Sequence, residues 1–148
     1  MDFKTVVSEF GRRAGIPVAL SANGTAKLVF DDDIAVQIEQ DPSGTVLHFF
    51  TVIGNIPSDT DGRTVMYEAL LSANLFGQGT GGAVLAIDTA RNEVVLSIEL
   101  SAQTASVELF EKNLETLLEH APVWRANVVD YQNGTNTPEI PVAGAIRV

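Results

Sequence analysis

The chain of 148 residues is 45% hydrophobic and 19% charged, a composition typical of one folded domain with its own core and not of a disordered segment. Its net charge of −10 comes without any basic cluster, so neither nucleic acid nor an anionic membrane surface is an expected partner. The absence of cysteine excludes disulfides, thiolate metal sites and cysteine nucleophiles. With neither an export signal nor a run of about twenty apolar residues, we expect a cytoplasmic protein without membrane insertion.

The first half of the sequence predicts one helix followed by three strands. Apolar residues recur at intervals of three and four over residues 2–14, and Gly15 supplies the stop. Three runs of strand character follow at residues 26–30, 34–40 and 45–53, separated by turn-forming residues, so we expect an antiparallel meander. The third run carries apolar side chains on both faces. This strand is therefore either covered on both sides or part of a binding surface.

The second half predicts a helix, two strands and a last helix. Residues 61–77 carry an apolar face wider than that of an ordinary surface helix, which indicates contacts on two sides. Strands are expected at residues 83–88 and 93–100. A long helix begins near Ser106, and we expect a kink or a helix end near Glu119, because the interior Pro122 removes one backbone hydrogen bond and crowds the preceding turn.

Together these elements describe one α+β domain over residues 1–131, in the order helix, three-stranded antiparallel meander, helix, two strands, helix. Residues 132–148 are rich in Asn, Gly, Thr and Pro, and we expect them to form a flexible tail.

No group of residues points to catalysis. Residues 77–82 (GQGTGG) match the spacing G-x-G-x-x-G, but they follow a helix and enter a strand, whereas a dinucleotide-binding loop leads into a helix N-terminus. The run from Asp31 to Asp33 lacks the alternate spacing of calcium ligands and suits a solvated turn. His48 and His120 have no recognisable catalytic partner in the sequence. We therefore predict that the protein is not an enzyme and has no catalytic residue, metal site or cofactor.

Several short segments resemble one protein family. The segment ANLFGQGTGGA at residues 73–83 resembles the central motif of the CesT or Tir-chaperone family of type III secretion chaperones. The segments LVFDDD from Leu28, GNIP from Gly54 and APVWR ending at Arg125 resemble further parts of that family, and they occur in the order of the predicted elements. Pro122 departs from the family pattern, and the tail lies beyond it.

This resemblance implies a homodimer in the bacterial cytoplasm that binds the extended N-terminal segment of one or more secreted effector proteins. It would keep them soluble and export-competent, without ATP and without a reaction, and secretion-apparatus components are further candidate partners. Apolar patches would bind the effector, with these candidates: Phe10, Ile16, Leu28, Phe30, Val36, Ile38 and Phe50. The middle helix would form the dimer interface through these residues: Met66, Leu70, Leu71, Asn74 and Leu75.

Two alternatives remain open from the sequence. The first is a small nucleotide- or metabolite-binding domain, or an enzyme, that uses the loop of residues 77–82. The second is a regulatory protein that shares the fold of the secretion chaperones and serves another process.

Overall fold

The computed structural model describes residues 1–133 and contains one five-stranded sheet in the order β1-β2-β3-β5-β4 together with three α-helices. The elements are α1 (Phe3–Ala14), β1 (Thr25–Phe30), the 3-10 helix η1 (Asp31–Asp33), β2 (Ile34–Gln40), β3 (Val46–Asn55), α2 (Thr60–Asn74), the 3-10 helix η2 (Leu75–Gly77), β4 (Val84–Asp88), β5 (Glu93–Ser101) and α3 (Val107–Gln132). Strand β2 pairs antiparallel with both β1 and β3, and β4 pairs antiparallel with β5. The predicted α+β class, element order and meander are confirmed.

Two predicted helix ends are wrong. The middle helix ends at Asn74 and not at Gly77, because Phe76 has a left-handed backbone (φ 55°) that cannot continue an α-helix. The last helix does not end near Glu119, which was expected as the alternative to a kink, but continues to Gln132. Pro122 lies on the exposed side of α3, whereas Ala121 and Trp124 beside it are fully buried. Packing of that buried face therefore outweighs the loss of one backbone hydrogen bond.

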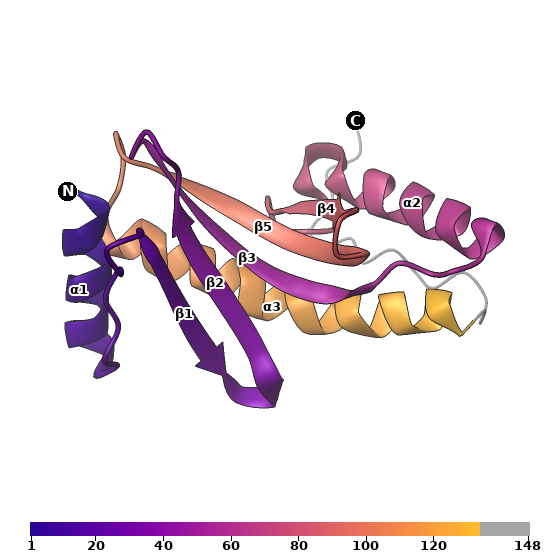
Figure 1. The fold of residues 1–148 in the computed structure, drawn as a ribbon, viewed down its shortest axis with the longest axis horizontal. Helices are drawn as coiled ribbons and strands as arrows, with labels where there is room; N and C mark the ends of the chain where they lie inside the picture. The colour runs from indigo at the N-terminus through magenta and orange to yellow at the C-terminus, as the bar shows by residue number, and fades with distance from the viewer. Residues whose placement is uncertain (134–148) are drawn as a thin grey trace. The chain divides into compact units, whose positions relative to one another are not determined.

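The chain divides into two compact units. Unit 1 comprises residues 1–51 and 98–117, and unit 2 comprises residues 52–97 and the chain from Leu118 onward. Strands β3 and β5 and helix α3 each continue from one unit into the other. Within unit 1, α1 lies beside the first turns of α3, and within unit 2, α2 lies beside β4 (Figure 1).

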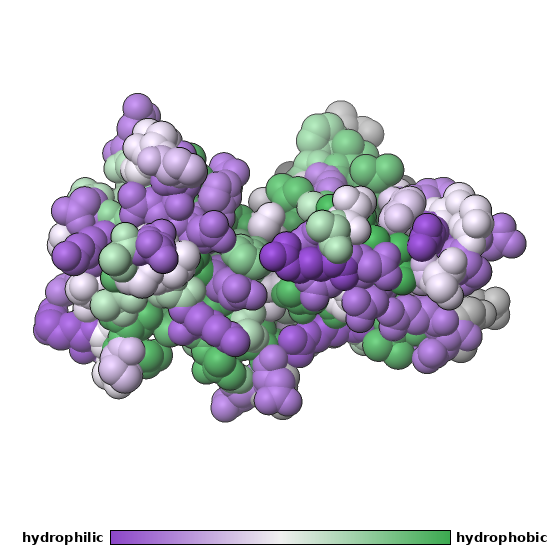
Figure 2. Space-filling model, viewed as in Figure 1, coloured by the Kyte–Doolittle hydropathy of each residue, from purple (hydrophilic) through white to green (hydrophobic). Residues whose placement is uncertain are grey.

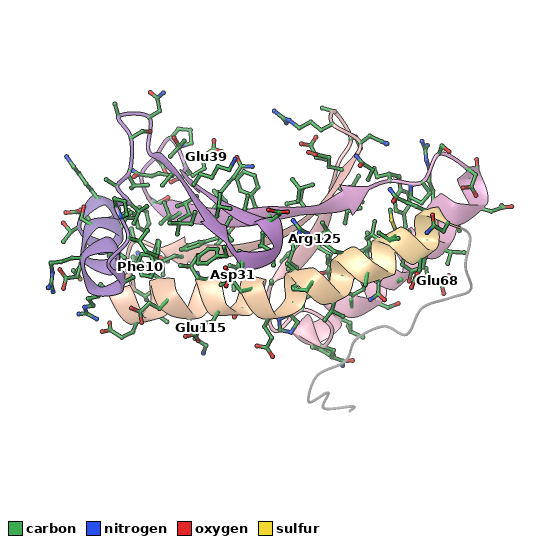
Figure 3. The ribbon with its side chains drawn as sticks, turned by 90° about the horizontal axis from the view of Figure 1, so that it is seen from below. Phe10, Asp31, Glu39, Glu68, Glu115 and Arg125 are labelled. Atoms are coloured by element: carbon green, nitrogen blue, oxygen red, sulfur yellow. The ribbon has the colours of Figure 1, made fainter. Side chains whose placement is uncertain are left out.

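The core of unit 1 is built around α1. The helix begins where the side chain of Asp2 accepts the Thr5 N–H at 2.8 Å, and it ends at Gly15, whose φ of 68° few other residues adopt. From its buried face Phe10 reaches toward α3 (Figure 3), and its ring centroid lies 4.9 Å from that of Phe110. Phe110 is in turn 4.9 Å from Phe49 of β3. Three aromatic rings thus join helix, sheet and α3 within this unit.

The core of unit 2 is built around Trp124 of α3. The side chain of this residue is fully buried. Its indole N–H donates to the carbonyl oxygen of Gly79 at 2.9 Å, so the one polar atom of the ring has a partner inside the core.

The flexible tail expected at residues 132–148 lies outside the described residues apart from Gln132 and Asn133. Among residues 1–133, none of the helices combines the length and the apolar character that crossing a bilayer requires.

Candidate protein-binding surfaces

Four of the seven candidate effector-binding residues belong to the core of unit 1. Val36 and Ile38 of β2 are almost fully buried, and Leu28 of β1 lies opposite Val36 in the antiparallel register. Phe10 is buried against Phe110. In this conformation these four side chains stabilise the unit and are not available to a partner. Periodicity placed them correctly on the apolar faces of their elements, but it could not tell a buried face from an exposed one.

The other three candidates, Ile16, Phe30 and Phe50, are half-buried. Phe50 lies opposite Gln37 of β2, on the sheet face that points away from the core. Along β3 the residues from Leu47 to Ile53 alternate between buried and half-buried, so one side of this strand is core and the other is partly open. The two interpretations of the third strand are thereby decided: it is covered on one face only.

Val29 of β1 extends this open face within unit 1. It lies opposite Ala35 and is 66% exposed. The sequence analysis did not name Val29 as a candidate. Successive residues of a strand point to opposite faces, so a buried Leu28 implies that Val29 lies on the open face.

The open face of unit 1 also carries acidic groups. Glu39 lies opposite His48 across the β2–β3 pair, and the Oε1 atom of Glu99 lies 3.6 Å from His48 Nδ1. The half-buried Phe50 occupies the same face of β3 as His48. A partner segment that combines apolar side chains with a basic one would match both properties of this surface.

The five predicted interface residues of unit 2 divide into three groups. Met66 and Leu70 are buried in the unit. Leu71 is 71% exposed and Leu75 is 56% exposed, so the wide apolar face of α2 is not fully covered by its own chain. Asn74 is half-buried, so its exposure is intermediate between those of the other two groups.

Two exposed apolar residues next to this surface were missed by the sequence analysis. Phe76 is 81% exposed because its left-handed backbone turns it away from the stripe of α2, and Val84 at the start of β4 is 51% exposed. Figure 2 shows hydrophobic residues gathered over the C-terminal end of α2 and the turn after it. Leu71, Leu75, Phe76 and Val84 are called the α2 patch below. Exposed apolar residues that gather in this way are typical of a protein interface.

A groove of about 420 Å³ lies between α2 and β4 in unit 2. Its lining residues are mostly apolar: Tyr67, Leu70, Leu71, Leu85, Ala86, Ile87 and Thr89. Leu71 belongs both to the groove and to the α2 patch, so the groove and the patch adjoin each other.

The glycine loop of residues 77–82 is packed as a connection between α2 and β4. The N–H groups of Gln78, Gly79 and Thr80 donate to carbonyl groups of the preceding turns at 3.0 to 3.2 Å. At Gly81, a β-carbon would lie 2.5 Å from the His120 ring of α3, so this position has no room for a side chain. A phosphate-binding loop directs its N–H groups at the ligand, whereas three of these groups are already used within the chain. The nucleotide alternative gains no support from this geometry.

The side chain of Asn74 makes two hydrogen bonds to the backbone of one residue in β4. Its Nδ2 donates to the Leu85 carbonyl at 2.9 Å, and its Oδ1 accepts the Leu85 N–H at 2.8 Å. β4 is an edge strand of the sheet, so these bonds are made on its open side. Asn74 therefore bonds to Leu85 as a neighbouring strand would.

Comparison with known proteins gives one family and one fold. The model of the Tir chaperone protein (CesT) family matches residues 5–125. A protein of Chlamydia pneumoniae, CPj0713/CpB0740, is 24% identical over 125 residues, which cover 83% of this chain and 93% of that protein.

Solved structures share the fold at low sequence identity. The ExsC–ExsE complex matches with a TM-score of 0.68 and 23% identity, covering 86% of this chain and 97% of the matched chain. The HopA1–SchA chaperone–effector complex matches with a TM-score of 0.67 and 19% identity over 84% and 93%. The Yersinia pestis type III secretion chaperone SycH, bound to a fragment of YscM2, matches with a TM-score of 0.63 and 19% identity over 82% and 98%.

Proposed function

Because this chain belongs to the Tir chaperone protein (CesT) family, we propose that it is a type III secretion chaperone that binds the extended N-terminal segment of a secreted effector. The family match over residues 5–125 carries this proposal. Three structural relatives support it, since each is a complex with a second protein: ExsE, HopA1 or a YscM2 fragment. The chaperone would act in the bacterial cytoplasm, keep the effector export-competent, and need neither a cofactor nor a chemical step.

The open sheet face of unit 1 is the proposed effector surface. Phe50 and Val29 supply apolar contact area there, and Glu39 and Glu99 supply negative charge. Ile16 and Phe30 are half-buried and are retained as contact residues of the same unit. An extended segment that carries both apolar and basic side chains on the side facing the sheet would fit this surface, because alternate residues of a strand point to the same side.

The α2 patch and the groove beside it are the proposed dimer interface. Each chain has a net charge of −10, so two copies repel each other unless they meet through an uncharged surface. The α2 patch supplies four exposed apolar side chains for such a contact. A two-fold interface uses the same patch on both copies, which a continuous apolar surface can satisfy.

The proposal is tested by co-expressing the chain with candidate secreted proteins and treating the purified complex with protease. We expect an N-terminal effector segment to copurify and to be protected from cleavage. The test variant is Phe50→Glu, on the open face. Its matched control is Ser72→Glu, which adds the same charge to α2 in the other unit. Phe50→Glu should abolish protection and Ser72→Glu should retain it. Failure of every candidate to copurify with a folded wild-type chain would contradict the chaperone function.

A further inference from the structure

His48 lies between two carboxylates on the open sheet face of unit 1. Glu39 of β2 lies directly opposite it in the antiparallel register. Glu99 of β5, the strand on the other side of β3, has its Oε1 atom 3.6 Å from His48 Nδ1. The imidazole is 42% exposed and the Glu99 side chain is 66% exposed, so solvent and a bound partner can both reach them. The three side chains form one row across the sheet, called the His48 row below.

Two further charged residues lie beside the His48 row. Lys27 of β1 lies two residues from the partner of Glu39, and two strands separate β1 from β5, so Lys27 is nearer to Glu39 than to Glu99. Asp41 follows β2, and its carboxylate is already used within the turn. The hydrogen bond from the Ser43 hydroxyl, together with bonds from the backbone of the same turn, lowers the pKa of Asp41 to about 2. Glu99 is therefore the carboxylate whose surroundings depend most on the imidazole.

The charge of the His48 row depends on one proton. Histidine is the side chain whose ordinary titration falls between about pH 5 and 8. When the imidazole is neutral, the Glu99 carboxylate is available to a basic side chain of a bound segment. When the imidazole is protonated, Glu99 has a cation of its own chain 3.6 Å away, and that cation repels a second one. A proton on His48 and a basic side chain at Glu99 therefore compete with each other.

We propose that His48 makes effector binding depend on pH: a segment that places a Lys or Arg side chain at Glu99 binds more tightly when His48 is neutral than when it is protonated. This role rests on the proposed effector surface and specifies the charge that the surface selects. Affinity for a basic segment therefore rises with pH, and by linkage the segment displaces part of a proton from His48 as it binds. Phe50, on the same face of β3, supplies apolar contact that does not titrate.

The test uses short random peptides displayed on phage as ligands for the open face. Peptides are selected on the full chain at pH 7.5, and those that also bind Phe50→Glu are discarded because they bind elsewhere. We expect the remaining peptides to combine apolar residues with Lys or Arg. Their affinities are then measured by titration calorimetry at pH 7.5 and 5.5. Binding should be about two- to fivefold weaker at pH 5.5, the effect of one exposed ion pair.

Three variants assign this pH dependence to the His48 row. His48→Gln keeps a polar side chain that does not titrate, so the affinities at the two pH values should become equal. Glu99→Gln removes the carboxylate for which the two cations compete and should have the same result. The matched control is Glu115→Gln, an exposed residue of α3 in the same unit that lies away from Glu39 (Figure 3) and should retain the wild-type ratio. Circular dichroism at both pH values checks folding.

Equal affinities of the wild type at the two pH values, or the same pH dependence in His48→Gln, would overturn the role of His48. Tighter binding at pH 5.5 would overturn it as well. If no selected peptide distinguishes the wild type from Phe50→Glu, the open face does not bind extended segments and the proposal is wrong.

The chaperone function is decided separately by copurification. An effector that copurifies and is retained equally at both pH values would overturn the role of His48 alone. Peptides that bind with the expected pH dependence while no secreted protein copurifies would support the role of His48 and contradict the chaperone function.

Discussion

Helices α1 and α2 are both amphipathic and both begin at an Asp cap, yet they differ in what covers their apolar faces. The apolar residues of α1 from Phe3 to Phe10 are all buried within unit 1. In α2, Met66 is fully buried while Leu71, five residues later, is 71% exposed. The comparison teaches that one helix serves its own core, whereas the other divides its apolar residues between the core and a surface left for a partner.

The largest expected effect comes from the buried side of this comparison. Phe10→Ala should lower the free energy of unfolding by about 3 to 5 kcal/mol, because it removes a ring packed on Phe110 and leaves a cavity. Urea unfolding measures the change. The control is Val29→Ala in the same unit, where a 66% exposed side chain should cost less than about 1 kcal/mol. Equal losses in the two variants would contradict the assignment of Phe10 to the core.

The next effect concerns the exposed side. Leu71→Glu should convert the dimer into a monomer with little change in its secondary structure, because the charge would be buried in an apolar contact without a partner. Light scattering measures the mass. Ser72→Glu adds the same charge to the neighbouring position of α2 and should leave the mass unchanged. A Leu71→Glu dimer would exclude the α2 patch as the interface.

The smallest effect concerns the start of α1. The backbone hydrogen bond from Thr5 lowers the pKa of Asp2 below its ordinary value of 3.8. The charged carboxylate therefore stabilises the fold above about pH 4, and this contribution is lost as the pH falls through the lowered pKa. Asn at this position also caps a helix but does not titrate.

We accordingly expect the melting temperature of the wild type to fall relative to that of Asp2→Asn as the pH is lowered from 7 to 3. Parallel pH profiles of the two proteins would show that the Asp2 charge contributes nothing to α1.

Much of the fold could be predicted because it follows local rules. Strand β2 was predicted with its observed bounds, and Ile34, Val36 and Ile38 are buried on one face while Gln37 and Glu39 are exposed on the other. Alternation along a strand has a period of two residues, so a short stretch of sequence determines it. The same holds for the first helix, whose stop at Gly15 was predicted.

The binding surfaces could be predicted only in part. Leu71 and Leu75 were named and are exposed, but Met66 and Leu70 of the same stripe are buried. Phe76 lies within residues 61–77, the span predicted as helix, but it has a left-handed backbone and its side chain is exposed. Periodicity identifies which residues share a face of a helix, but it contains no information on what lies opposite that face.

The sequence alone determined the composition, the order of helices and strands, and the membership of a chaperone family over residues 5–125. These depend on residues close together in the chain. Only the tertiary structure decided that α3 continues past Pro122, that residues 77–82 form a packed connection, and that Asn74 bonds across the β4 edge to Leu85. Each of these depends on contacts between residues distant in sequence, such as the hydrogen bond from Trp124 to Gly79. The packing and hydrogen bonds of such contacts outweigh the local preferences of proline and glycine.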